Sequence, residues 1–182
     1  MHLKTLDLPL RRSCNDSFST VSLGGWLQEN MITIAFLADH LDTIPTLTGW
    51  FRKQWPEYHA DMSQEEMERD FLEDASRDRL PIRLVAFESN ELAGTIILRE
   101  QTGSVPEFQP ELGGLYVVET HRCQGIGTEL VRAGMKLARD QRYETVFATT
   151  VLAAGILERQ GWEFVKNIIH QDGQLALYRC KL

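Results

Sequence analysis

One stretch of the sequence, Gly113 to Val131, constrains the fold more than any other. It begins with a short apolar segment, Leu115 to Val118, that is typical of a strand, and it continues through a polar turn into a loop with two glycines. Gly125 and Gly127 lack Cβ atoms, so backbone N–H groups there can approach a ligand closely. The helix expected next adds unpaired first-turn N–H groups and a partial positive charge. The stretch therefore predicts an anion site, best suited to phosphates.

The size and composition of the chain are those of an ordinary globular domain. At 182 residues it is long enough to bury one proper core. Its formal net charge of −7 argues against a general nucleic-acid binder and mildly favours a cationic partner. Its three cysteines are far apart, which gives no metal-ligand cluster and fits a reducing cytosol. No apolar run reaches the length of a membrane span, so we expect a cytoplasmic protein with no metal, nucleic-acid or membrane partner.

Residues 1–30 differ from the rest of the chain, because Ser, Asn and Gly are scattered through them without sustained hydrophobic periodicity. They lack the apolar core of a secretory signal. Met31 is followed at once by a strand-like run, Ile32 to Leu37. We therefore expect an N-terminal extension over 1–30 and a single domain over 31–182. Two interpretations of the extension stay open: a peripheral segment, or an arm that docks on the partner subunit of a homodimer.

The remaining sequence predicts a mixed α/β (α+β) domain with a largely antiparallel sheet. A helix is expected from Asp42 or Thr43, either of which can cap it, with Pro45 in its first turn. Ser63 and Glu66 form a capping box that opens a second helix to about Arg77. The later elements, in chain order, are strands over 82–88 and 92–99 joined by a turn that carries Asn90, the strand before the glycine loop, a helix to about Asp140, a strand over 145–151, a helix over 153–160 ended by Gly161, and a closing hairpin over 162–169 and 174–180.

Two common phosphate sites do not fit the loop. A P-loop needs Lys and then Ser or Thr directly after its second glycine, whereas Thr128 and Glu129 follow Gly127. A dinucleotide fingerprint needs three glycines early in a parallel βαβ unit, and Gly125 to Gly127 supplies only two in mid-chain. The residues themselves leave the phosphate ligand open.

The pattern R-x-Q-G-x-G at Arg122 to Gly127, directly after a strand that ends in L-Y-V, closely resembles the acetyl-coenzyme A signature of the GNAT superfamily of N-acetyltransferases. The segment Gly155 to Trp162 is similar to a later motif of that superfamily, commonly LYE-x-x-GW. The expected order of helices and strands from Met31 to Leu182 also resembles that of the superfamily. The resemblance implies a GNAT-like central sheet flanked by helices, with the fourth and fifth strands splayed apart.

The resemblance also assigns cofactor-binding residues. In GNAT proteins the strand before the loop offers backbone groups to the acetyl and pantetheine portion, and the loop cradles the pyrophosphate. On this sequence the strand residues are Leu115, Tyr116 and Val117, Arg122 fixes the loop, and the loop residues are Cys123, Gln124, Gly125, Ile126, Gly127 and Thr128. Acetyl-coenzyme A is therefore the expected co-substrate.

The implied chemistry is direct acyl transfer from a thioester to the primary amine of a small molecule or a peptide. A primary ammonium, with a reference pKa near 10.4, must first lose a proton. A backbone N–H near Val117 is the expected donor to the oxyanion of the tetrahedral intermediate. Glu111 is our choice of general base, with Glu119, His121 and His170 as further options.

The sequence departs from the superfamily at Leu157, where a tyrosine commonly serves as general acid. Tyr116 or Tyr178 can take that role instead, or the thiolate leaves unaided or takes a proton from water. Two hypotheses about function therefore stand. The first is an active N-acetyltransferase with Glu111 and Tyr116 as catalytic residues, and the second is a catalytically weak acyl-coenzyme A-binding or regulatory module.

Overall fold

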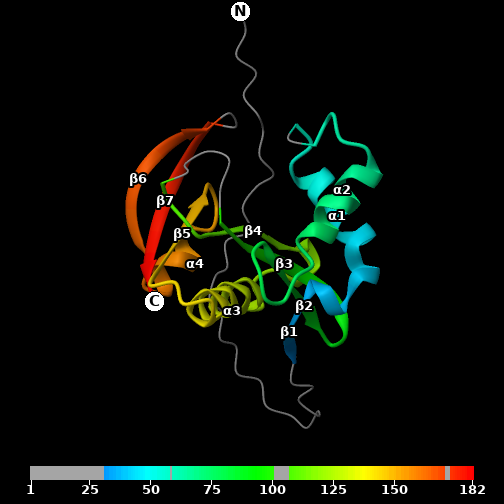
Figure 1. The fold of residues 1–182 in the computed structure, drawn as a ribbon, viewed down its shortest axis with the longest axis horizontal. Coiled ribbons are helices and arrows are strands. Elements are labelled where there is room, and N and C mark those ends of the chain that lie inside the picture. Colours follow the sequence, from blue (N-terminus) through cyan, green and yellow to red (C-terminus); the bar gives the residue numbers. More distant parts are fainter. Residues whose placement is uncertain (1–30, 58, 101–106, 171–172) are drawn as a thin grey trace, which may run out of the picture.

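The computed structural model of the chain describes residues 31–57, 59–100, 107–170 and 173–182, without the side chain of His170. The helices and strands are β1 (Ile32–Phe36), α1 (Ile44–Gln54), α2 (Gln64–Glu73), β2 (Ile82–Glu88), β3 (Glu91–Arg99), β4 (Glu111–Val117), α3 (Ile126–Asp140), β5 (Thr145–Thr150), α4 (Ala154–Arg159), β6 (Glu163–His170) and β7 (Gly173–Lys181), with short 3₁₀ turns η1 (Leu37–Asp39), η2 (Leu41–Thr43) and η3 (Glu119–His121). Figure 1 shows these elements along the chain.

Seven strands of the described part form one sheet in the order β1-β2-β3-β4-β5-β7-β6. Neighbouring strands run antiparallel except β4 and β5, which are parallel. These two strands share a single pair, Glu111 with Phe147, where the Phe147 N–H donates to the Pro110 carbonyl at 3.0 Å. Beyond that pair, β4 and β5 part as they run to their C-terminal ends. The predicted mixed, largely antiparallel sheet with a splayed fourth and fifth strand is therefore confirmed.

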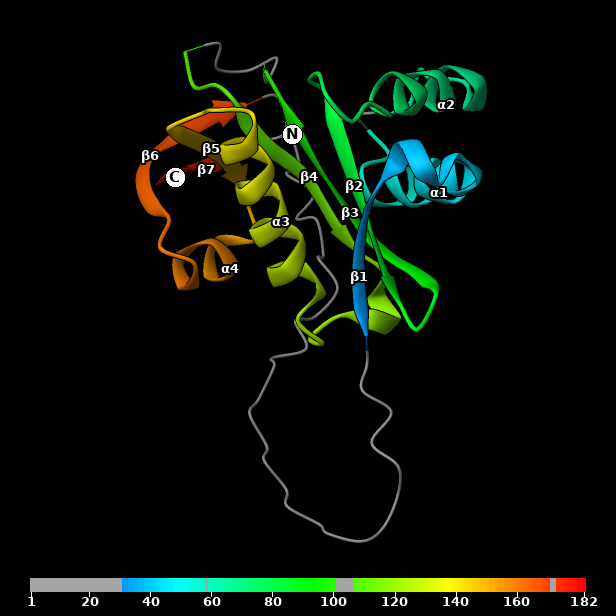
Figure 2. The same ribbon diagram turned by 60° about the horizontal axis from the view of Figure 1, so that its bottom comes forward.

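Helices cover the sheet on both faces, with α3 and α4 on one face and α1 and α2 on the other (Figure 2). On the α3 face, Leu130 and Val131 of the helix pack with Leu84 of β2, Ile96 of β3 and Leu112 of β4. Burying a side chain of this size contributes roughly 1.5–3 kcal/mol. On the opposite face a second cluster joins the two helices to the sheet, and its buried members are Leu37, Ile44, Leu47, Phe51, Met67, Phe71 and Val85.

The capping box predicted for the second helix is present. Ser63 Oγ accepts from the Glu66 N–H at 3.1 Å, and the Glu66 carboxylate accepts from the Ser63 N–H at 2.7 Å. The predicted end at Arg77 is wrong, because α2 stops at Glu73. Asp74 is the C-cap residue, and it accepts from Arg83, which donates its backbone N–H to the Asp74 carbonyl and two guanidinium hydrogens to the carboxylate.

The start of α1 differs from the expectation in its cap. Pro45 does lie in the first turn, but no side chain caps the helix. Thr43, the expected cap, donates its hydroxyl hydrogen to the His40 carbonyl at 2.6 Å instead. The preceding turn η2 leads the chain directly into α1, so this helix start needs no extended capping residue.

Two local backbone features shape the middle of the sheet. The hairpin expected between β2 and β3 is present, but its turn has two residues rather than the three expected over 89–91, because Glu91 already pairs with Glu88. Ser89 and Asn90 both have positive φ, 50° and 70°. In β4, Gly114 has φ of +56°, and the pairing of β3 with β4 shifts register between Thr95 and Ile97. This bulge lies just beyond the point where β4 and β5 separate, so it bends β4 along the opening.

Candidate active site

The loop between β4 and α3 has the geometry of an anion site. Cys123 and Gly125 have φ of 63° and 87°, which turns the chain sharply into the helix. Gly125 is the N-terminal flanking residue of α3, and no side chain caps the helix there. The first-turn N–H groups of α3 are thus left for a ligand, and the helix dipole favours a negative one.

The two glycines of this loop are required for different reasons. Gly125 adopts the left-handed conformation, and a Cβ atom added to it would meet nothing within 4 Å. A Cβ on Gly127 would lie 3.1 Å from Ile156 Cδ1 and 3.8 Å from Val117 Cγ2. The first turn of α3 therefore fits closely between the end of β4 and α4, beside the opening in the sheet.

Arg122 ties the loop to the strand that precedes it. Its Nε donates to the carbonyl of Val117 at 2.9 Å, so the side chain folds back over the end of β4. The Gln124 side-chain amide makes a similar contact with the carbonyl of Thr120 at 3.3 Å. Both bonds are local and hold the loop in one shape.

The three strand residues expected to meet the cofactor divide between the faces of the sheet. Leu115 and Val117 pack against the core on the α3 face. Tyr116 faces α1, where its ring centroid lies 5.2 Å from that of Trp50 and 6.3 Å from those of Phe51 and Trp55. Trp55 is still 37% exposed, and Trp50 and Tyr116 are half-buried, so this aromatic cluster keeps an accessible surface.

Glu111 lies at the closed end of the opening and is only 2% exposed. Its Oε2 accepts a hydrogen bond from Nε of Arg99 at 2.8 Å, and Nη2 of Arg99 makes an ion-pair contact with the same oxygen at 2.8 Å. Its Oε1 accepts from the Thr149 hydroxyl at 2.8 Å. Both oxygens of the proposed general base are therefore engaged, and the carboxylate connects β3, β4 and β5 where β4 and β5 make their one pair.

A second buried ion pair lies on the same face. Arg83 pairs with Asp74 at 2.6 Å, and its guanidinium stacks over the Phe71 ring at 4.2 Å and the Phe51 ring at 5.2 Å. Burial raises the pKa of Asp74, although the positive charge of Arg83 opposes the shift. This pair fixes the end of α2 against β2, behind the aromatic cluster.

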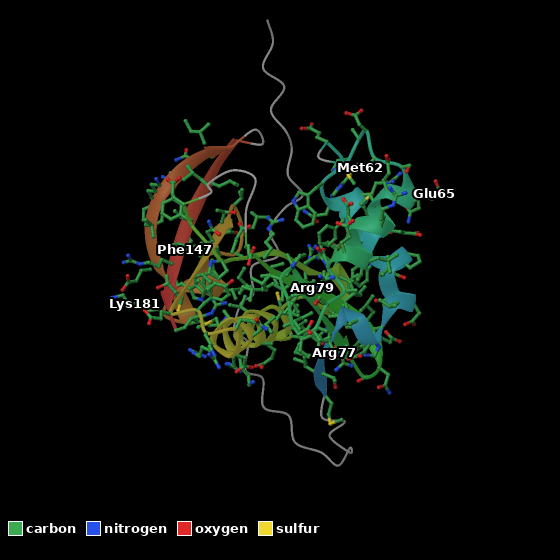
Figure 3. All side chains as sticks on the ribbon, viewed as in Figure 1. Met62, Glu65, Arg77, Arg79, Phe147 and Lys181 are labelled. Carbon is green, nitrogen blue, oxygen red and sulfur yellow. The ribbon has the colours of Figure 1, made fainter. Side chains whose placement is uncertain are left out.

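On the face of the sheet that carries α1 and α2, the side chains on the two sides of β4 come from distant parts of the sequence. In Figure 3 the side chain of Phe147 lies on the β5 side of β4, and that of Met62, between α1 and α2, lies on the opposite side. The Phe147 ring is 5.2 Å from that of Phe108, and Lys166 Nζ lies 4.8 Å over the Phe108 ring.

The other residues named as general acid or general base lie in positions less suited to proton transfer. Tyr178 is 4% exposed and donates its hydroxyl hydrogen to Glu158 at 2.7 Å; this bond, followed by burial, raises the pKa of Tyr178. Leu157 is 3% exposed and belongs to the core of the α3 face. His121 lies 3.5 Å from Glu88, against the β2–β3 hairpin, and the side chain of His170 is outside the described part.

Sequence reasoning missed Arg99 and Thr149. Neither belongs to a motif, and each meets Glu111 only through strand pairing: Arg99 by its register with Glu111, and Thr149 because Phe147 pairs with Glu111 two residues earlier. Alternation along β5 puts Thr149 on the same face as Phe147. A prediction of the β3–β4 register could have found Arg99, and a prediction of the β4–β5 register could have found Thr149.

The sheet of this chain opens between two parallel strands, and an uncapped helix N-terminus lies beside the opening. Several solved structures of acetyltransferases resemble the chain in fold. An aminoglycoside 6'-acetyltransferase type Ii is 23% identical, with a TM-score of 0.63 over 82% of this chain and 96% of its own. An aminoglycoside 6'-N-acetyltransferase complexed with coenzyme A is 20% identical, with a TM-score of 0.63 and the same two coverages. The Salmonella typhimurium protein yncA, with its cofactor acetyl-CoA, is 18% identical, with a TM-score of 0.65 over 84% and 95% of the two chains. Likeness at these identities shows the fold alone.

The family is shown by the sequence profile of the Acetyltransferase (GNAT) family, which matches residues 44–161 of the 182. The chain belongs to the GNAT acetyltransferase family. The predicted resemblance to the GNAT superfamily is confirmed, and the chain is an acetyltransferase by family. No curated protein matches it significantly in sequence.

The described residues contain neither a metal-ligand cluster nor a membrane-spanning helix. Among these residues, no three His, Cys, Asp or Glu side chains are grouped so that they would hold a metal ion. No helix in the same ranges combines the length and the apolar character needed to cross a membrane.

Proposed function

We propose that the chain moves an acetyl group from acetyl-coenzyme A to the primary amine of a small molecule or peptide, by direct attack in a ternary complex. The observation that carries the proposal is the opening between β4 and β5 next to the uncapped N-terminus of α3. In this proposal residues 31–182 form the catalytic domain and residues 1–30 form an extension. The reaction takes place in the cytoplasm.

The cofactor occupies the opening from the α3 side. Its pyrophosphate lies on the backbone N–H groups of Cys123, Gln124, Gly125, Ile126, Gly127 and Thr128, and Arg122 holds that loop through the Val117 carbonyl. Its pantetheine arm pairs with the exposed edge of β4 at Leu115, Tyr116 and Val117, as an added strand would. Coenzyme A and acetyl-CoA in solved structures of the same fold support acetyl-coenzyme A as the co-substrate.

The acceptor approaches from the α1 and α2 face. The accessible rings of Trp50, Trp55 and Tyr116 offer an apolar surface that also attracts an ammonium group through cation–π contact. The exposed carboxylates of Glu57 and Glu107 lie on segments of the same side and add attraction for a cation. A small-molecule amine is the acceptor that this surface fits, and the aminoglycoside acetyltransferases of the same fold act on acceptors of that kind.

The chemical step uses few groups of the chain. The acceptor nitrogen attacks the thioester carbon, and a backbone N–H near Val117 donates to the oxyanion. Glu111 takes the proton that the nitrogen loses, and Tyr116 is the proposed donor to the departing thiolate. No covalent enzyme intermediate is needed. Leu157 cannot donate a proton, and Tyr178 is committed to Glu158.

The test is a thiol-release assay with acetyl-coenzyme A over a panel of amines, run beside calorimetric binding of coenzyme A. We expect turnover above the enzyme-free background with at least one amine. Binding of coenzyme A without turnover on any amine would overturn the enzyme proposal in favour of the weak acyl-coenzyme A-binding module that Leu157 also allows. Failure to bind coenzyme A would refute the cofactor site itself.

A further inference from the structure

Thr149 connects the buried carboxylate of Glu111 with the open face of the sheet. It lies on β5, two residues after the residue that pairs with Glu111, and its hydroxyl donates to Glu111 Oε1 at 2.8 Å. Thr149 is half-buried, whereas Glu111 is almost fully buried. A hydroxyl that donates one hydrogen bond keeps two lone pairs for an outside partner. Thr149 can therefore contact a ligand that Glu111 cannot reach.

The hydrogen bonds around Glu111 make its two oxygens different. Arg99 donates its Nε hydrogen to Oε2 at 2.8 Å, and its Nη2 makes an ion-pair contact with the same oxygen at 2.8 Å, so the positive charge lies beside Oε2. Charge-assisted bonds of this kind are the stronger ones in proteins. Within the described residues, Oε1 accepts its hydrogen bond from the Thr149 hydroxyl, a donor whose proton can pass to the carboxylate. Any proton that reaches the carboxylate through these contacts arrives at Oε1 by way of Thr149.

The contacts among Arg99, Glu111 and Thr149 lie at the closed end of the opening between β4 and β5. Glu111 pairs with Phe147 at the closed end of the opening, and β4 and β5 diverge beyond this pair. A cofactor whose pyrophosphate lies at the N-terminus of α3, beyond Val117, extends its arm back along β4 toward this closed end. The reacting end of the cofactor is thus brought toward the face that Thr149 shares with Phe147.

We propose that Thr149 relays the acceptor's proton to Glu111, an inference that rests on the proposed function. As the carbon–nitrogen bond forms, the acceptor nitrogen gives a proton to Thr149 Oγ1, and the hydroxyl proton of Thr149 passes to Glu111 Oε1. The carbon–sulfur bond then breaks and the coenzyme A thiolate leaves. The relay returns the proton from Glu111 to solvent through the same hydroxyl, which restores the starting state.

The competing role for Thr149 is structural: its hydrogen bond to Glu111 holds β5 against β4, a role that we call a clasp. A clasp matters for the shape of the opening, so its loss weakens coenzyme A binding and lowers stability. A relay matters for the transfer of a proton, so its loss lowers kcat while the affinity for coenzyme A is unchanged. General acid–base groups typically contribute about 10²- to 10⁴-fold to a rate.

The experiment compares Thr149→Val, Thr149→Ser and Thr149→Asn on the full chain, with Thr145→Val as the matched control from the same strand and face. Serine keeps both the bond to Glu111 and the mobile proton. Asparagine keeps a donor to Glu111 but no proton that can be passed on. The relay predicts a kcat loss of about 100-fold or more for the Val and Asn variants, recovery in the Ser variant, and coenzyme A binding within about twofold of wild type in all of them.

Two outcomes overturn the relay: wild-type kcat in Thr149→Val, or recovery in Thr149→Asn, which identifies a clasp. If Thr149→Val does not fold, Thr149→Ala takes its place under the same criteria. A solvent isotope series in mixed H₂O and D₂O adds an independent readout, because the relay moves two protons together, whereas with a clasp the acceptor passes a single proton directly to its base. Wild-type turnover is measured first, so that a chain without activity counts against the proposed function and a slow variant counts for the relay.

Discussion

Replacing Gly125 with alanine tests the loop geometry most sharply. The residue has φ of 87° and open space around its Cβ position, so alanine costs strain without any clash. An L-residue in the left-handed conformation pays roughly 1–2 kcal/mol. If that cost is expressed when the loop closes on the pyrophosphate, it equals a loss of about 5- to 30-fold in coenzyme A affinity. Isothermal calorimetry with coenzyme A measures it directly.

Gly161 provides the matched control. It has φ of 82°, a Cβ position that is equally open, and a place after α4 rather than in the loop. Gly161→Ala therefore carries the same strain but is expected to leave coenzyme A affinity within about twofold of wild type. Gly125→Asn is expected to recover part of the affinity, because Asn tolerates this conformation better. Equal losses in the Gly125 and Gly161 variants, or no loss in Gly125→Ala, would refute the reasoning.

Three further substitutions follow from single contacts. Arg122→Ala removes the bond to the Val117 carbonyl, so steady-state kinetics should show KM for acetyl-coenzyme A raised about 2- to 10-fold with kcat nearly unchanged; an unaltered KM would separate Arg122 from the loop. Tyr178→Phe removes the bond to Glu158, so urea unfolding should show a loss of about 1 kcal/mol while kcat stays within twofold. A hundredfold fall in kcat would instead make Tyr178 the proton donor. Ser63→Ala breaks the capping box of α2 and should lower Tm by about 2–4 °C in a thermal melt, and an unchanged Tm would mean that the cap contributes nothing.

The parts of the structure that the sequence predicts well are those with local causes. The helix after Gly125 carries a strong apolar period, and α3 ends at Asp140 as expected. The turn at Ser89 and Asn90 is set by its own residues, and so is the capping box at Ser63. Each of these features is decided within a few residues of chain, which is the range over which sequence patterns act.

The features that could not be predicted depend on distant parts of the chain. At the end of α2, the carbonyl and the carboxylate of the C-cap residue Asp74 both accept hydrogen bonds from Arg83 on β2. The burial of Glu111 follows from its register with Arg99 and from the hydroxyl of Thr149, which lies on another strand. A carboxylate at the start of β4 looks accessible in the sequence, and only the packed sheet shows that Glu111 is buried with both of its oxygens engaged.

Amide hydrogen exchange with and without acetyl-coenzyme A tests the central claim most directly. The account predicts slower exchange on binding at the backbone of Leu115, Tyr116 and Val117 and in the loop from Cys123 to Thr128, with no change in β1 at the far edge of the sheet. Exchange that is unaltered in both segments, or that slows elsewhere instead, would contradict the placement of the cofactor in the opening between β4 and β5.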